Sequence, residues 1–64
     1  MIRVNGELQT FVAETVDQLL RRLLIEPRGV AVAIDGEIVR KSEWSVTKIE
    51  EGSSIEIVTA VAGG

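Results

Sequence analysis

Cysteine and histidine are both absent from the 64 residues of the chain. The protein therefore has no thiol nucleophile, no imidazole base, no disulfide and no Cys/His metal site. A domain of this size buries only about 60% of the surface that its unfolded chain exposes, which leaves no room for a cleft walled on several sides. The sequence therefore predicts a protein that is not an enzyme, with no catalytic residue and no bound metal.

Positive charge and long apolar runs are also scarce. The formal net charge is −3, and the seven basic residues are spread along the chain rather than clustered. Nucleic-acid binding needs clustered Lys and Arg, and a membrane span needs a longer apolar stretch. Met1 is not followed by the basic and apolar segments of a signal peptide. We expect a cytoplasmic protein with neither a nucleic-acid nor a membrane partner.

Two dipeptides predict β-hairpins. Asn5-Gly6 and Asp35-Gly36 fit type I′ turns, in which both central residues need positive φ. Alternating or branched apolar residues around these turns, and again near the C-terminus, are typical of strands. The predicted strands cover residues 2–4, 8–12, 30–34, 37–40 and 54–59.

One amphipathic helix is predicted to begin after Thr15. Gln18 lies three residues later, which completes a T-x-x-Q capping box, and Pro27 prevents the helix from continuing. A single apolar stripe is expected to pack on the sheet, and it consists of Val16, Leu19, Leu20, Leu23 and Leu24. Trp44, the only tryptophan, is expected to cover one end of the small core.

The order of these elements predicts an α+β fold of the β-grasp (ubiquitin-like) class. A hairpin, a crossing helix and a final strand beside the first give a mixed sheet of four to five strands packed on one helix. Residues 1–59 would form this domain, and residues 60–64 a flexible C-terminal tail.

The sequence ends on Gly63-Gly64, after small uncharged residues. Glycine has no Cβ, so such an end can enter a channel too narrow for any side chain. An extended residue advances at most about 3.3–3.6 Å, so residues 60–64 would reach on the order of 15 Å beyond the sheet. We expect the Gly64 carboxylate to be the group that reacts or is recognised.

Several short motifs in this order resemble one family over nearly the whole chain. They are Val4-Asn5-Gly6-Glu7, Leu19-Leu20, Val30-Ala31-Val32-Ala33-Ile34 with Asp35-Gly36-Glu37, Ser42-Glu43-Trp44, Ile55-Glu56-Ile57-Val58 and Ala62-Gly63-Gly64. The chain resembles the ThiS family of bacterial sulfur carriers for thiazole formation in thiamine biosynthesis, within the ubiquitin-like ThiS/MoaD superfamily.

This resemblance implies the chemistry of the C-terminus. An adenylating (E1-like) enzyme would use ATP and Mg²⁺ to adenylate the Gly64 carboxylate. A sulfur donor such as a cysteine desulfurase would convert it to a thiocarboxylate, and thiazole synthase would take the sulfur. Gly63 and Ala62 would thread into the partner, and the carrier itself would bind no cofactor. Val58, Ala60 and Phe11 would contribute to partner docking on the open face of the sheet.

Three alternatives remain open at this level. The chain could carry sulfur for molybdopterin or another product, although the short chain and the absence of proline before Gly63 favour thiamine. It could be a ubiquitin-like protein modifier, because the activation chemistry is shared. It could also be a β-grasp binding module in which the C-terminal glycines have no role.

Overall fold

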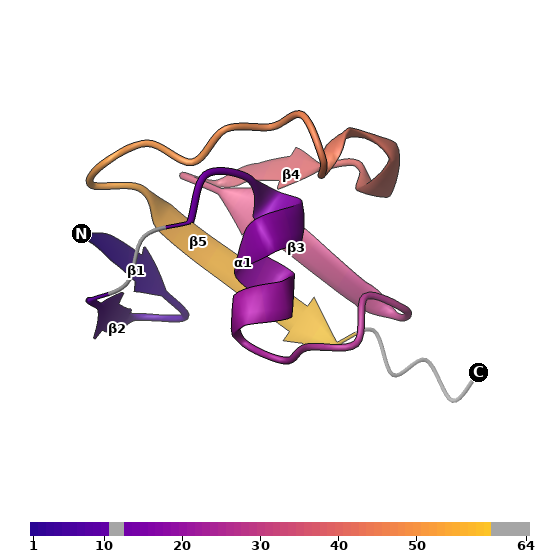
Figure 1. The fold of residues 1–64 in the computed structure, drawn as a ribbon, viewed down its shortest axis with the longest axis horizontal. Helices are drawn as coiled ribbons and strands as arrows, with labels where there is room; N and C mark the ends of the chain where they lie inside the picture. Colours follow the sequence, from indigo (N-terminus) through magenta and orange to yellow (C-terminus); the bar gives the residue numbers. More distant parts are fainter. Residues whose placement is uncertain (11–12, 60–64) are drawn as a thin grey trace.

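The described part of the chain, residues 1–10 and 13–59, forms a sheet with one helix packed on it (Figure 1). The structure is a computed structural model. The hairpin strands are β1 (Ile2–Val4) with β2 (Glu7–Gln9), and β3 (Val30–Ile34) with β4 (Glu37–Val39). Between the hairpins lies helix α1 (Val16–Arg22), and a short 3₁₀ helix η1 (Lys41–Glu43) precedes the last strand, β5 (Ser54–Thr59).

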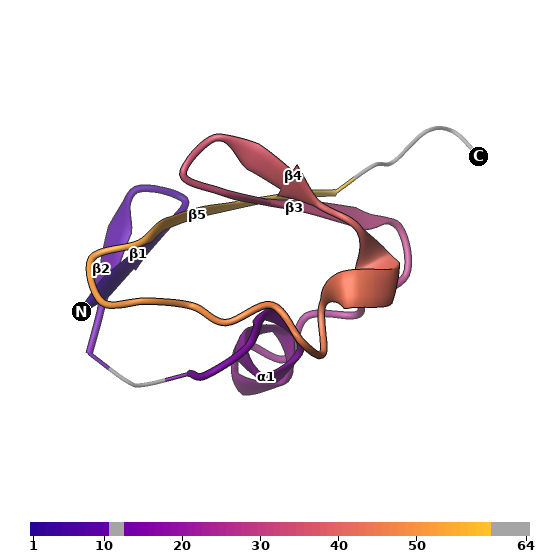
Figure 2. The same ribbon diagram turned by 90° about the horizontal axis from the view of Figure 1, so that it is seen from above.

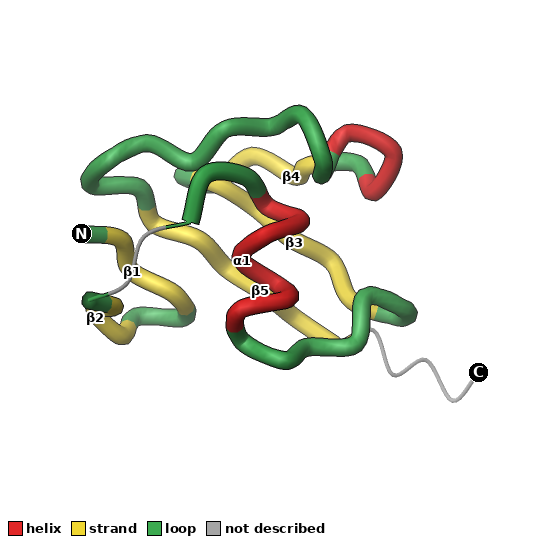
Figure 3. The backbone as a smooth tube through the Cα atoms, viewed as in Figure 1, coloured by secondary structure: helices red, strands yellow, loops and turns green. Residues whose placement is uncertain are grey.

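The strands form a five-stranded mixed sheet in the order β2-β1-β5-β3-β4. The central strand β5 runs parallel to β1 and antiparallel to β3 (Figures 1 and 3). Seen along the sheet, α1 and the chain that follows η1 lie on one side of it (Figure 2). No described element covers the opposite side. This arrangement confirms the predicted β-grasp fold.

Both predicted hairpin turns are present, with positive φ at their central residues. The φ angles are 52° and 84° at Asn5 and Gly6, and 49° and 90° at Asp35 and Gly36. The strands around them are shorter than predicted, since β2 ends at Gln9 and β4 at Val39. Residues 11 and 12, the end of the predicted second strand, lie outside the described residues.

Asn5 also extends the sheet with its side chain. The Cα register of β1 and β5 ends at Val4 and Ile55, because β1 turns away into its hairpin. The Asn5 Oδ1 atom accepts a hydrogen bond from the Ile57 N–H at 2.8 Å, and Nδ2 donates to the Ile57 carbonyl at 3.1 Å. The amide thus takes the place of a backbone peptide group and holds the second half of β5.

We expect Asn5→Gly to lower the free energy of unfolding by about 1–3 kcal/mol, because it leaves the partly buried N–H and C=O of Ile57 without this partner. Glycine keeps the positive φ that the turn needs. Asp35→Gly is the matched control, since it removes one exposed bond from the Ser54 N–H to Asp35 Oδ1. Urea unfolding should show a smaller loss of unfolding free energy for this control than for Asn5→Gly. Equal losses for the two variants would contradict the role given to Asn5.

Helix α1 begins as predicted but ends early. Thr15 caps it, because its Oγ1 accepts from the Gln18 N–H at 3.3 Å. The Gln18 side chain bonds back to the Glu14 N–H, one residue before the position that a capping box implies. The helix has seven residues. No helix in residues 1–10 and 13–59 is long and apolar enough to cross a membrane.

The prediction that Leu24 belongs to the buried stripe is wrong. Leu24 has a φ of 59° and its side chain is 92% exposed. The Leu24 N–H bonds to the Arg21 carbonyl at 3.1 Å and the Ile25 N–H to the Leu20 carbonyl at 2.9 Å, which is the Schellman pattern of helix ends. This reversal of the chain brings Ile25 against the core instead.

The core lies between α1 and the covered side of the sheet. Its buried residues are Ile2, Val4, Ala13, Val16, Leu19, Leu20, Val32, Trp44, Ile55 and Ile57. Trp44 is 3% exposed and its indole N–H donates to the Val39 carbonyl at 3.0 Å. Trp44 therefore covers the core as predicted, and its one polar atom is satisfied.

Candidate functional site

The end of β5 is the part of the described structure nearest in sequence to the predicted reactive group. β5 runs from the side of the molecule that holds Met1 to the opposite end, where Thr59 pairs with Val30 (Figure 1). β1 pairs with the first two residues of β5, and the Asn5 side chain bonds to Ile57. β3 pairs with β5 as far as Thr59 and so holds the end of the strand. The sheet therefore provides a firmly held base for the residues that follow Thr59.

Most predicted site residues lie outside the described residues. These are Gly64 as the modified residue, Gly63 and Ala62 as its threading neighbours, and Ala60 and Phe11 as docking residues. The division into a domain of residues 1–59 and a tail of residues 60–64 depends on the same part of the chain. These assignments stay predictions.

Val58 is the one predicted site residue that the structure describes. Burial alternates along β5, with Ile55 and Ile57 buried and Val58 60% exposed. Val58 lies directly opposite Ala31 of β3. Since Ile55 and Ile57 face the core beneath α1, Val58 lies on the other side of the sheet. The predicted facing of β5 is confirmed, whereas a role of Val58 in docking stays a prediction.

Two further apolar side chains share this open face and were missed from the sequence. Leu8 lies opposite Arg3, whose side chain is exposed between the buried Ile2 and Val4. Ile38 is 73% exposed and lies opposite Ala33 of β3. Ala33 also pairs with the exposed Glu56 of β5, so Ile38, Ala33 and Glu56 share one face of the sheet. The signal that could have found them is the residue pairing across each two-residue turn.

The charged groups on this face are few. Arg3 and Glu56 are the exposed charges on β1 and β5, and Ser54 lies beside Arg3 in the parallel register. The open face thus offers apolar contacts from Leu8, Ile38 and Val58 around one residue of each sign. Such a surface can dock a protein, but among the residues that the structure describes it holds no side chain suited to acyl or sulfur chemistry.

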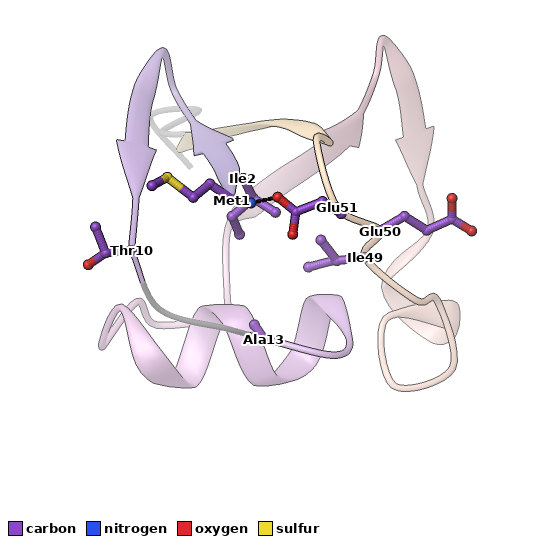
Figure 4. A pocket seen from close by; sticks show the side chains of 7 residues that line it. All are labelled: Met1, Ile2, Thr10, Ala13, Ile49, Glu50 and Glu51. Carbon is purple, nitrogen blue, oxygen red and sulfur yellow. Dashed lines mark ion pairs between the residues drawn. The ribbon is translucent and has the colours of Figure 1, made fainter.

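A small pocket of about 180 Å³ opens at the other end of the molecule, beside Met1 (Figure 4). Ile2, Ala13 and Ile49 give it an apolar lining, and Glu51 forms an ion pair with the N-terminal amino group at its edge. Glu50 points away from Glu51 in Figure 4. The two adjacent carboxylates therefore do not converge on a common point, and the pocket lacks a reactive centre.

Comparison with known sequences identifies relatives of this chain. A sequence model described as the ThiS family matches residues 2–64. The sulfur carrier protein ThiS of Escherichia coli K12 is 32% identical over 57 residues, which cover 89% of this chain and 86% of that protein. A thiazole synthase of Paramagnetospirillum magneticum is 40% identical over 62 residues, or 95% of this chain. The chain spans only 19% of the length of that synthase.

Comparison with solved structures agrees with the sequence matches. The crystal structure of a thiamine biosynthesis protein (ThiS) from Geobacter metallireducens superposes with a TM-score of 0.81 at 27% identity. The match covers 98% of this chain and 97% of that one. With the fold and nearly the whole sequence in agreement, the chain belongs to the ThiS family.

Proposed function

We propose that the protein is a sulfur carrier of thiamine biosynthesis whose Gly64 carboxylate holds the sulfur. The family match carries this proposal, because it extends through residue 64 and so includes Gly63-Gly64. The lack of Cys and His is compatible with it, since sulfur held as an acyl thiolate needs no thiol from the carrier.

The chemistry takes place on the carboxylate and is supplied by partners. A carboxylate oxygen attacks the α-phosphorus of ATP, and pyrophosphate leaves. The acyl-adenylate is then attacked at its carbonyl carbon by a hydrosulfide equivalent, AMP leaves, and a thiocarboxylate remains. The adenylating enzyme holds ATP and Mg²⁺, so the carrier contributes the carboxylate and the means of delivering it.

Delivery requires reach and docking. Five residues follow Thr59, and an extended chain advances at most about 3.3–3.6 Å per residue, so Gly64 can lie on the order of 15 Å from the sheet. Ordering these residues costs roughly 1–2 kcal/mol each in backbone entropy, which docking of the folded body must offset. Val58, with Ala60 and Phe11, is proposed to dock on the partner from the open face.

The proposed acceptor of the sulfur is a thiazole synthase. A sequence similar to this chain forms part of a protein named thiazole synthase in Paramagnetospirillum magneticum, which supports a link between the two activities. The sulfur donor is proposed to be a cysteine desulfurase or a protein charged by one.

The first test is carrier-dependent release of pyrophosphate from MgATP by the adenylating enzyme encoded in the same genome. We expect pyrophosphate release to require the carrier. Without a sulfur donor, the total released should stop at one pyrophosphate per carrier chain, because each chain has one Gly64 carboxylate to adenylate. Absence of release with any adenylating enzyme of the host would contradict the proposed function.

Val58→Glu should raise the KM for the carrier in this assay about tenfold or more, because it replaces an apolar contact with a charge that must be desolvated. The melting temperature should not change, since Val58 is exposed. The matched control is Val46→Glu, at a residue that is 72% exposed in the segment between η1 and β5. Equal KM values for the two variants would show that Val58 is not part of the docking surface.

A further inference from the structure

Leu24 has an unusual backbone conformation. Three described residues other than glycine have positive φ, and Asn5 and Asp35 are of the types that tolerate it. Leu24, with a φ of 59°, is a bulky residue in the left-handed region, which is a true outlier. Strain of this kind is retained where another requirement outweighs it.

Neither the helix end nor the core requires a leucine at this position. The Schellman bonds come from backbone groups of residues 24 and 25, and it is Ile25 that packs against the core cluster, which includes Leu20. Glycine is the usual residue at this place in the motif and asparagine is the next choice. At 92% exposure, Leu24 is also the most exposed large apolar side chain of the described residues.

The position of this residue in the fold suggests what it contacts. The connection of residues 23–29 joins α1 to β3, and the first residue of β3, Val30, pairs with Thr59. Figures 1 and 3 show this connection at the end of the molecule where β5 finishes. A protein that takes up the residues after Thr59 must therefore approach this end.

The charge around Leu24 differs from that of the whole chain. The net charge of residues 17–28 is +1, from three arginines and two carboxylates. These residues are Arg21, Arg22, Arg28, Asp17 and Glu26. The whole chain has a net charge of −3. An apolar side chain within a locally positive segment fits an apolar hollow with carboxylates at its rim.

We propose that Leu24 is a docking contact for the adenylating enzyme, inserted in an apolar hollow beside the channel that receives Gly64. The inference rests on the proposed function. The adenylating enzyme is chosen because activation of the carboxylate is common to sulfur carriage for any product and to protein modification. Leu24 and the open face would then hold the carrier from the two sides of its sheet.

The test compares Leu24→Gly, Leu24→Asn and Leu24→Met with the unmodified carrier in the pyrophosphate-release assay. Gly and Asn relieve the backbone strain and remove the apolar side chain, whereas Met keeps an apolar side chain. Burial of a leucine side chain is worth enough for the KM of the Gly and Asn variants to rise about tenfold or more. The Met variant should stay near the unmodified value.

The same substitution that weakens docking should stabilise the fold, which thermal unfolding measures. Leu24→Gly should raise the melting temperature by about 2–6 °C, because a strained residue is replaced by one that tolerates positive φ. Val46→Gly is the matched control, an exposed apolar residue outside the 17–28 segment, and it should leave the KM unchanged. A variant that is more stable and yet docks worse separates a contact role from a structural one.

The outcomes separate this inference from the function on which it rests. If the unmodified carrier supports no pyrophosphate release, the proposed function fails. If it does, and Leu24→Gly and Leu24→Asn keep its KM, Leu24 does not contact the adenylating enzyme. The inference is equally overturned if these variants weaken only binding to thiazole synthase or only self-association of the carrier in light scattering.

Discussion

Deletion of Gly64 is expected to lower the rate of sulfur loading by at least about 10²-fold, because a misplacement of only 1 Å can cost that much. The shortened chain still ends in a carboxylate, on Gly63. That carboxylate would stop about 3.3–3.6 Å short of the position that Gly64 reaches. It would therefore be too far from the ATP α-phosphorus for attack, although its chemical reactivity is the same.

The deletion should have no effect on folding. The buried cluster that stabilises the domain runs from Ile2 to Ile57, and β5 completes its pairing with β3 at Thr59. Circular dichroism should give the same melting temperature for both chains, while mass spectrometry follows loading. A shortened chain that loads sulfur at the original rate would show that the position of the carboxylate does not matter.

Leu19→Ala is expected to unfold most of the protein near physiological temperature. Leu19 is wholly buried, and truncation of such a leucine to alanine costs about 2–5 kcal/mol. A single core in a domain of fewer than about 70–80 residues rarely supplies more than about 3–5 kcal/mol in total. The loss is therefore comparable with the whole stability of the domain.

Leu24→Ala is the matched control for this substitution. It removes the same atoms from a leucine five residues further along the chain, and that leucine is exposed. We expect its melting temperature to stay within a few degrees of the unmodified protein, whereas Leu19→Ala should lose the cooperative transition or shift it by about 10 °C or more. Similar melting curves for the two variants would contradict the core as described.

The sequence was sufficient to predict the elements that local chemistry determines. Asn5-Gly6 and Asp35-Gly36 need positive φ wherever they occur between strands, so both hairpins could be placed. The alternation in residues 54–59 gave the bounds and the facing of β5. Trp44 is buried, as expected for a single large aromatic side chain that covers one end of a small core.

Features that depend on the competition between local and tertiary contacts were not predictable. The helical spacing of Leu24 continues the stripe of α1, yet the chain reverses at that residue because Ile25 packs on the core in its place. The side-chain bonds of Asn5 to Ile57 join residues 52 positions apart. Such contacts appear only when the parallel pairing of β1 and β5 is known.

For the site, the sequence supports one specific prediction of the chemistry, which stays a prediction, and only a partial prediction of the docking surface. Gly64 was predicted from the Gly63-Gly64 end that follows small uncharged residues, and from the resemblance of the whole chain to one family. Leu8 and Ile38 were missed because their place on the open face follows from the register of two hairpins. Docking surfaces arise from the assembled sheet, whereas a terminal carboxylate needs no partner within its own chain.

The central claim is that the terminal carboxyl group of Gly64 carries the sulfur. The most direct measurement is the mass of the protein isolated from its own host during growth without thiamine, with fragmentation of its last residues. The account predicts that one oxygen is replaced by sulfur and that fragmentation assigns the sulfur to Gly64. Sulfur bound at another residue, or a mature chain that does not end on Gly64, would contradict it.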